Sequence, residues 1–153
     1  YHVNKEGSGD MYQKSSLMLH TLRTLIDDDK LWFEMLKGIA KEFQYQTIDG
    51  QHILDYINKK SGKDFSVFFD QYLKNIDLPE FQYKLIKQGR DVTLMFRWEA
   101  IANFDIPILV NTGKNNFWIY PNSDWKEQSL GKMDIDDFMV IEELFLIEVK
   151  KIK

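Results

Sequence analysis

Histidine is the side chain best suited to bind a metal or to transfer a proton at neutral pH, and the chain has three, at scattered positions. None of His2, His20 and His52 belongs to an H-E-x-x-H sequence, the spacing that lets one helix hold a catalytic zinc ion. His20 comes two residues after Met18, which belongs to a helical apolar stripe, so we interpret it as a boundary or surface residue. His52 is interpreted in the same way. The histidines therefore predict no metal site in this chain.

Other short motifs of enzymes are absent from the sequence as well. It lacks the phosphate-binding G-x-x-x-x-G-K-[ST], the dinucleotide-binding G-x-G-x-x-G and the G-x-S-x-G of a serine nucleophile. Three consecutive aspartates, residues 27–29, lack the spaced oxygens and the glycine of a calcium loop, so we interpret them as capping acids in a turn. Cysteine is absent, which removes disulfides and thiol nucleophiles but is compatible with either a reducing or an oxidising compartment.

The composition is typical of a soluble globular chain with one ordinary domain or two small ones. Of 153 residues, 29% are charged and 44% are hydrophobic, and aromatic residues reach 14%, enough for a bulky core. The 24 acidic and 20 basic residues give a net charge of −4, shared equally between the two halves. Because a nucleic-acid binder usually presents a basic face, we expect no nucleic-acid partner. No apolar run is long enough to span a membrane.

Residues 11–75 repeat apolar side chains at helical spacing and predict four amphipathic helices with short connections. We expect Asp27–Asp29 to end the first helix and to cap the second, since acids are favourable at a helix N-terminus. Thr47 or Asp49 is expected to cap the third helix. That helix should end at Gly62, because glycine readily adopts the left-handed conformation of a helix C-terminus.

The fourth predicted helix is the most aromatic part of the chain. Asp64 is expected to cap it, and Phe65, Phe68, Phe69 and Tyr72 form one stripe along it. This stripe is too wide to be covered by one neighbouring helix. We therefore expect the helix to lie between the helical block and the segment that follows.

After Leu78-Pro79 the apolar period changes from 3.6 residues to two, which predicts half-buried strands of an antiparallel sheet. We predict an α+β chain of two units, with about four helices in residues 1–78 and a small antiparallel β-sandwich in residues 79–153. Five or six strands are expected, with candidates at residues 81–85, 92–98, 106–111, 117–120, 126–130 and 144–150.

Two helical segments, MYQKSSLMLHTLR at 11–23 and SGKDFSVFFDQYL at 61–73, have a more specific pattern. Together they resemble the alanyl-aminopeptidase family of zinc metallopeptidases, a gluzincin group whose members carry Y-x-K-G-x-x-x-L-x-x-L-R, then S-G-x-D-x-x-x-F-F-x-Q-W-L, then a β-sandwich. Residues 96–98 and 104–108 are similar to strand segments of that sandwich. Ser15 and Tyr72 depart from the family's glycine and tryptophan. The matching residues are Tyr12, Lys14, Leu19, Leu22, Arg23, Ser61, Gly62, Asp64, Phe68, Phe69, Gln71 and Leu73.

The resemblance implies that the chain belongs to a zinc-dependent aminopeptidase, which removes N-terminal residues from peptides by attack of a metal-activated water. Residues 1–78 would be the helical C-terminal part of a thermolysin-like catalytic domain, and residues 79–153 the β-sandwich domain. In the family the zinc ligands precede the tyrosine segment. Zinc and the peptide substrate would thus belong to the full-length parent, whose missing N-terminal catalytic region would pack on this chain. This chain alone is expected to hold no cofactor and to be inactive.

The resemblance also assigns one catalytic residue. Tyr12 matches the family's tyrosine that stabilises the charged oxygen of the transition state, as a hydrogen-bond donor beside the zinc ion. A simpler interpretation is an aromatic residue that only packs beside Met11.

Two non-catalytic functions remain alternatives. The parent could keep the fold as a scaffold after losing catalysis, or the sandwich could be a module that binds peptides or carbohydrates. The module hypothesis depends on Phe117, Trp118, Tyr120 and Trp125, four aromatic residues within nine positions. Exposed aromatic rings stack on sugars, although aromatic residues in strands are more often core. Alternation along a strand places Trp118 and Tyr120 on the face opposite Phe117.

Overall fold

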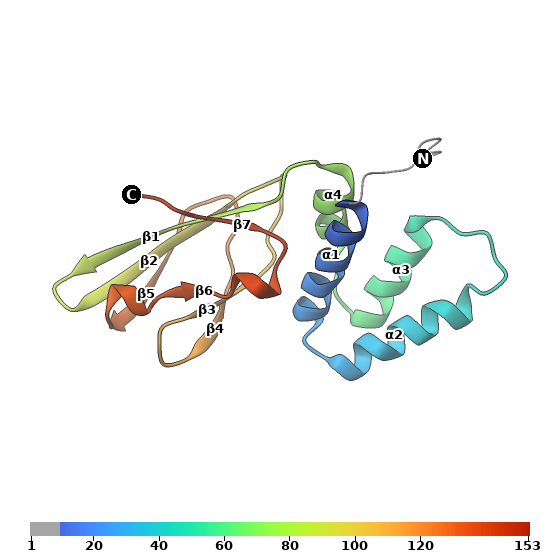
Figure 1. Ribbon diagram of the computed structural model, residues 1–153, viewed down its shortest axis with the longest axis horizontal. Helices are drawn as coiled ribbons and strands as arrows, with labels where there is room; N and C mark the ends of the chain where they lie inside the picture. Colours follow the sequence, from blue (N-terminus) through green and yellow to red (C-terminus); the bar gives the residue numbers. More distant parts are fainter. Residues whose placement is uncertain (1–9) are drawn as a thin grey trace.

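The computed structural model describes residues 10–153, in which four helices precede seven strands (Figure 1). The α+β prediction is confirmed, while the division into two domains at residue 78 stays a prediction. In Figure 1 the helices α1 and α4 lie next to the strands, and α2 and α3 lie farther away. The helices are α1 (Asp10–Ile26), α2 (Asp29–Glu42), α3 (Gly50–Ser61) and α4 (Ser66–Lys74). The strands are β1 (Glu80–Gln88), β2 (Asp91–Glu99), β3 (Ile108–Asn111), β4 (Asn116–Ile119), β5 (Lys126–Lys132), β6 (Met139–Val140) and β7 (Glu148–Lys151).

The predicted helix ends are confirmed by the hydrogen bonds of the capping residues. Asp28 caps α2, and its carboxylate accepts a hydrogen bond from the Leu31 backbone N–H at 2.9 Å. Asp49, and not Thr47, caps α3 by accepting from two backbone N–H groups of its first turn. Gly62 ends α3 with a φ of 69°, a conformation that costs glycine little.

The turn between α3 and α4 is held by a small set of polar side chains. The Asp64 carboxylate accepts from the Ser66 hydroxyl at 2.6 Å and from the Ser66 backbone N–H at 2.9 Å. Phe65 holds the N-cap position of α4, so the predicted cap at Asp64 is wrong by one residue, although its carboxylate binds the first residue of the helix. The two Ser66 donors, together with the Asn58 amide, lower the pKa of Asp64 from its usual 3.8. The Asn58 side-chain oxygen also accepts from the Phe65 backbone N–H at 2.9 Å. The start of α4 is therefore fixed against the end of α3.

The strands form two sheets, with the orders β5-β2-β1-β7 and β4-β3-β6. The prediction of a purely antiparallel sandwich is wrong at one pair, because β7 runs parallel to β1. The predicted strand over residues 144–150 is also too long, since residues 142–144 form a 3-10 turn. At Leu146 the backbone N–H donates to the Thr21 hydroxyl and the carbonyl accepts from the Tyr72 hydroxyl, each at 2.8 Å. Both backbone groups of Leu146 are therefore bonded to side chains of helices and are not available to a neighbouring strand. The pairing of β7 with β1 begins only after this residue.

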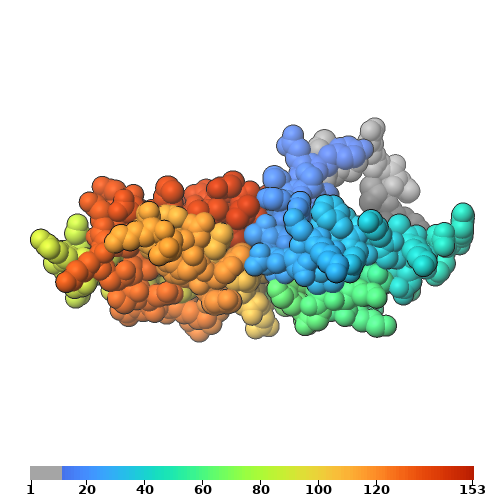
Figure 2. All heavy atoms as spheres, turned by 90° about the horizontal axis from the view of Figure 1, so that it is seen from below, coloured from blue at the N-terminus to red at the C-terminus, as the bar shows by residue number. Residues whose placement is uncertain are grey.

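One hydrophobic core extends from the helices into both sheets. Its path across the junction is a series of aromatic contacts that leads from α4 to the inner face of the four-stranded sheet. Ring centroids are 4.8 Å apart for Phe68 and Tyr72, 6.4 Å for Tyr72 and Phe104, and 5.1 Å for Phe104 and Trp98. Figure 2 shows the helical part, blue to green, in contact with the strands, yellow to red. The aromatic stripe thus joins the two parts, as the sequence predicts.

Candidate functional site

Most residues of the second aminopeptidase-like segment have a structural role. Gly62 and Asp64 shape the ends of α3 and α4, and Phe68 is a buried core residue. Gln71 is also buried, and its amide donates to the Asp77 carbonyl at 2.9 Å. Its side-chain oxygen accepts from the Ile101 backbone N–H at 3.1 Å. Phe68 and Gln71 therefore position α4 against the strands, and Gly62 and Asp64 shape the turn before it.

The first segment, on α1, also contributes to positioning. The Lys14 ammonium group donates to the Asn75 carbonyl at 3.1 Å, which places the beginning of α1 beside the end of α4. Leu22 is fully buried. Arg23 forms a two-point ion pair with Asp29, with both N–O distances at 2.8 Å. This pair fixes the angle at which α2 leaves α1.

Tyr12 differs from these residues because its side chain is 71% exposed. Within residues 10–153 its hydroxyl has no hydrogen-bond partner. It lies in the first turns of α1, on the same helix face as Ser15 and Leu19. The Lys14–Asn75 contact brings this end of α1 close to Leu73 on α4, which is 65% exposed. The assignment of Tyr12 as a catalytic residue stays a prediction.

The histidines and the three aspartates have separate positions. In the described part of the chain, no three acidic or histidine side chains lie close enough to bind a metal ion. His20 is exposed on α1, and His52 contacts the Asp49 carboxylate at 2.7 Å inside the cap of α3. His2 lies outside the described residues. Asp27 adopts a φ of 56° after α1, while Asp28 and Asp29 serve as cap and ion-pair partner.

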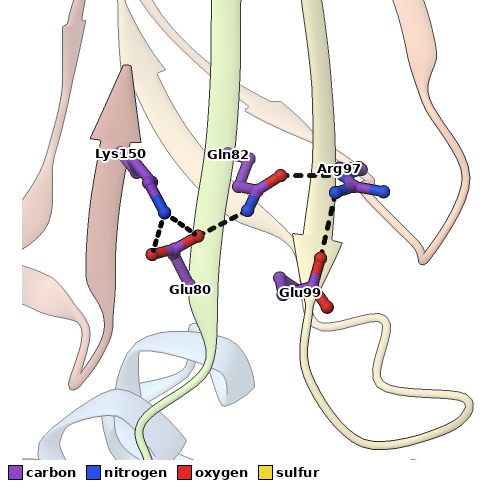
Figure 3. Close-up of polar contacts among 5 residues, drawn as sticks. All are labelled: Glu80, Gln82, Arg97, Glu99 and Lys150. Carbon is purple, nitrogen blue, oxygen red and sulfur yellow. Dashed lines mark hydrogen bonds and ion pairs between the residues drawn. The ribbon is translucent and has the colours of Figure 1, made fainter. Parts of the chain in front are cut away.

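A polar network crosses three strands on the outer face of the four-stranded sheet (Figure 3). Glu80 receives hydrogen bonds from the Lys150 ammonium group, at 3.1 Å, and from the Gln82 amide. The Gln82 oxygen accepts from Arg97 at 2.8 Å, and Arg97 also pairs with Glu99 at 2.9 Å. The Gln82 amide and then Lys150 lower the pKa of Glu80. Every charged group is paired, so this network stabilises strand pairing rather than forming an open reactive site.

A pH-dependent contribution to stability follows from the lowered pKa of Glu80. Because the folded state favours the ionised carboxylate, its stabilisation is complete above the usual value of 4.5 and is lost as the pH falls through the lowered value. Glu80→Gln keeps an oxygen for Gln82 but removes the charge. We expect the variant to be less stable than wild type by under about 1 kcal/mol at neutral pH, since the pair is partly solvent-exposed.

This difference should shrink toward zero as the pH falls well below 4.5, measured by urea unfolding across that range. Glu127→Gln is the control, because Glu127 is exposed on β5 without a hydrogen bond or ion pair in the described region. An equal pH dependence for both variants would contradict a specific role for Glu80.

The four clustered aromatic residues do not form one platform. Trp125 lies on the outer face of the four-stranded sheet, with Lys84 at 5.3 Å and Arg97 at 5.0 Å from its ring centroid. Trp118 is half-buried, and its ring packs edge-on against Phe145, with centroids 6.0 Å apart. Tyr120 is 63% exposed. Trp118 and Tyr120 therefore belong to a different surface from Trp125.

That surface is a cleft of about 800 Å³ between the helical part and the strands. Its walls come from the end of α1, the beginning of α4, residues 103–107 and the end of β4. A neighbouring cavity of about 330 Å³ shares Asp27 and Trp118 with it. Of the residues that line this cleft, only Trp118 and Tyr120 are ligand-binding candidates in the sequence. No sequence motif indicates that Asn103 or Asp105 binds a ligand, because only the tertiary fold brings them to the same cleft as the end of α1.

Comparison with known proteins supports the fold but not a family. No protein family and no curated protein match the sequence. Among solved structures, the chain is similar to an aminopeptidase A of Legionella pneumophila in complex with aspartic acid, with a TM-score of 0.72 and 14% identity. The similarity covers 92% of this chain and 18% of that chain. The fold therefore also occurs within a larger aminopeptidase, of which this chain spans less than a fifth.

Proposed function

We propose that this chain is part of a zinc-dependent aminopeptidase and that it supplies the transition-state donor Tyr12 together with the sandwich that follows. The observation that carries the proposal is the similarity of nearly the whole chain to one region of an aminopeptidase A. The two segments that resemble the alanyl-aminopeptidase family favour the same proposal from the sequence. Sequence identity of 14% leaves the gluzincin family itself a proposal.

Zinc would be bound by another part of the parent protein. The described residues offer no group of three acidic or histidine side chains for a metal ion. Bound elsewhere in the parent, zinc would supply the activated water and stabilise charge on the substrate carbonyl. The contribution of this chain is an exposed phenol on α1, which is able to donate a hydrogen bond to a developing oxyanion.

Exposed apolar side chains on the helices suggest where the rest of the parent packs. Three of the residues that match the family pattern, Tyr12, Leu19 and Leu73, are exposed, although aliphatic residues in such a pattern usually pack. Phe33 and Leu36 on α2 are exposed too, and the Arg23 guanidinium lies 5.4 Å from the Phe33 ring centroid. An apolar surface of this kind marks an interface in soluble proteins. We propose that the catalytic region of the parent covers it.

No helix among residues 10–153 has the length and hydropathy needed to cross a bilayer.

The test compares the protein encoded by the complete gene with the chain of residues 1–153. The complete protein is expected to retain about one zinc ion per molecule after dialysis and to release arylamine from amino-acid arylamides. The shorter chain is expected to do neither. Zinc content is measured by atomic absorption, and arylamine release is followed by absorbance.

Two outcomes would contradict the proposal. Stoichiometric zinc held by the chain of residues 1–153 would mean that this chain has its own metal site. A complete protein that folds but neither binds zinc nor hydrolyses arylamides would instead favour the scaffold function.

A further inference from the structure

The cleft between the helical part and the strands combines exposed aromatic rings with carboxylates. Tyr120 is 63% exposed and Trp118 is half-buried, so parts of both rings remain accessible in the cleft. The volume of about 800 Å³ is sufficient for a few residues of an extended peptide. An accessible ring face attracts the positive charge of a guanidinium or ammonium group.

The charged side chains of the cleft are three carboxylates and one ammonium group. Asp64 already accepts hydrogen bonds from Ser66 and Asn58 in the turn before α4. Asp27 and Asp105 are exposed, and within the described region neither carboxylate has a hydrogen-bond or ion-pair partner. Two carboxylates therefore remain available to a ligand in a cleft with an excess of negative charge.

The backbone adds to this negative potential. Helix α1 ends at the cleft, and the last carbonyl groups of a helix carry a partial negative charge. One of them, the Leu25 carbonyl, already accepts a hydrogen bond from the Lys63 ammonium group at 2.7 Å. Arg23, in the last turn of α1, is paired with Asp29. The carboxylate of Asp27, the next residue after the helix, has no partner among residues 10–153.

Two residues at the rim have left-handed backbone conformations. Asp27 has a φ of 56° and Asn103 a φ of 64°, and few residues other than glycine adopt such values. Aspartate and asparagine tolerate this conformation best among residues with a side chain. Both positions turn the chain sharply where the α1 end and the loop before β3 line the cleft.

We infer that this cleft binds an arginine-containing peptide segment, with the guanidinium group held by Asp27 and Asp105 and covered by the ring of Tyr120. Arginine fits better than lysine because its planar guanidinium group can donate two hydrogen bonds to one carboxylate and can also stack on an aromatic ring. A neutral saccharide could also stack on the rings, but the negative charge of the cleft would not increase its affinity. The inference concerns a site at the opposite end of α1 from Tyr12 and does not depend on the proposed aminopeptidase function.

The experiment measures binding of N-acetyl tri-arginine amide to the chain of residues 1–153 by calorimetry. The blocked tri-citrulline peptide, which has the same shape without charge, is the matched ligand control. We expect the citrulline peptide to bind at least about tenfold more weakly, and the arginine peptide to weaken between about 20 and about 200 mM salt.

Three variants test the residues directly. Asp27→Asn and Asp105→Asn keep the shape of the side chains and are each expected to weaken binding of tri-arginine by about fivefold or more. Tyr120→Ala should weaken it by about threefold, and it alters an exposed side chain that the fold does not need. Asp91→Asn, an exposed aspartate at the start of β2 and outside the cleft, should leave binding unchanged.

Several results would overturn the inference. An equal loss of tri-arginine affinity in Asp91→Asn and Asp105→Asn would show a nonspecific charge effect. Equal affinity for the arginine and citrulline peptides would show that the positive charge is not recognised. Binding of maltotetraose that is independent of salt and lost in Tyr120→Ala, without binding of tri-arginine, would identify a saccharide site instead. No binding of tri-arginine at low salt would also refute the inference, whether or not the complete protein is an aminopeptidase.

Discussion

Phe68→Ala is expected to leave the chain of residues 1–153 largely unfolded or insoluble. Phe68 is 2% exposed, and its ring contacts those of Phe65, Phe69 and Tyr72 at centroid distances of 6.1, 5.4 and 4.8 Å. Truncating a buried phenylalanine costs about 3–5 kcal/mol, against a total stability of about 5–15 kcal/mol for a domain.

The measurement is the far-ultraviolet circular dichroism spectrum and melting curve of the soluble fraction. Phe33→Ala is the matched control, because the same truncation occurs on a helix at a side chain that is 50% exposed. It should melt close to wild type. Phe69→Ala is expected to be intermediate, since Phe69 is only half-buried, although the sequence pattern alone predicts equal effects for the two residues. A Phe68→Ala melting temperature within a few degrees of wild type would contradict the central position of α4.

The sequence predicts the helices well because their signals are local. The caps at Asp28 and Asp49 and the left-handed Gly62 each depend on backbone groups within a few residues, so type and spacing are sufficient to find them. The strands β1 and β2 follow from simple alternation over residues 81–85 and 92–98, although both observed strands extend beyond these ranges. Both sets of elements were predicted at nearly the observed positions.

The parallel pairing of β7 could not be predicted, because it depends on contacts across most of the chain. The Leu146 N–H is held by Thr21, which is 125 positions away, and its carbonyl by Tyr72, 74 positions away. An apolar alternation at residues 144–150 gives no sign that these groups are bound to helices. The strand therefore begins later than the pattern indicates, and it lies beside β1 in the parallel direction.

Some of the candidate binding residues can likewise be predicted from the sequence, and others only from the fold. Trp118 and Tyr120 were singled out by their residue types, but the sequence also grouped them with Trp125, which faces Lys84 and Arg97 on another surface. Asp105 gave no signal, since only the fold brings it to the cleft with Asp27. The sequence is thus sufficient to identify the aromatic rings of the cleft, but the carboxylates beside them can be identified only from the tertiary structure.

Tyr12→Phe in the complete protein is expected to lower kcat by about 10²–10³-fold, with KM and zinc content close to wild type. A phenol O–H group is a neutral hydrogen-bond donor, so it can bind a developing oxyanion without introducing a charge. Phenylalanine keeps the ring and removes only the donor. Because the proposed interaction would form in the transition state and not with bound substrate, the loss should appear in kcat rather than in KM.

The exposed position of Tyr12 makes this substitution a clean test. Its side chain is 71% exposed, and its hydroxyl has no partner within residues 10–153, so Tyr12→Phe should not change the melting temperature. Tyr45→Phe is the matched control, because it removes a hydroxyl from another exposed tyrosine that lies outside the cleft, and it should leave kcat unchanged. A Tyr12→Phe enzyme with near-normal kcat would show that Tyr12 only packs against the rest of the parent. A lowered kcat with a lowered melting temperature in the complete protein would assign it the same packing role.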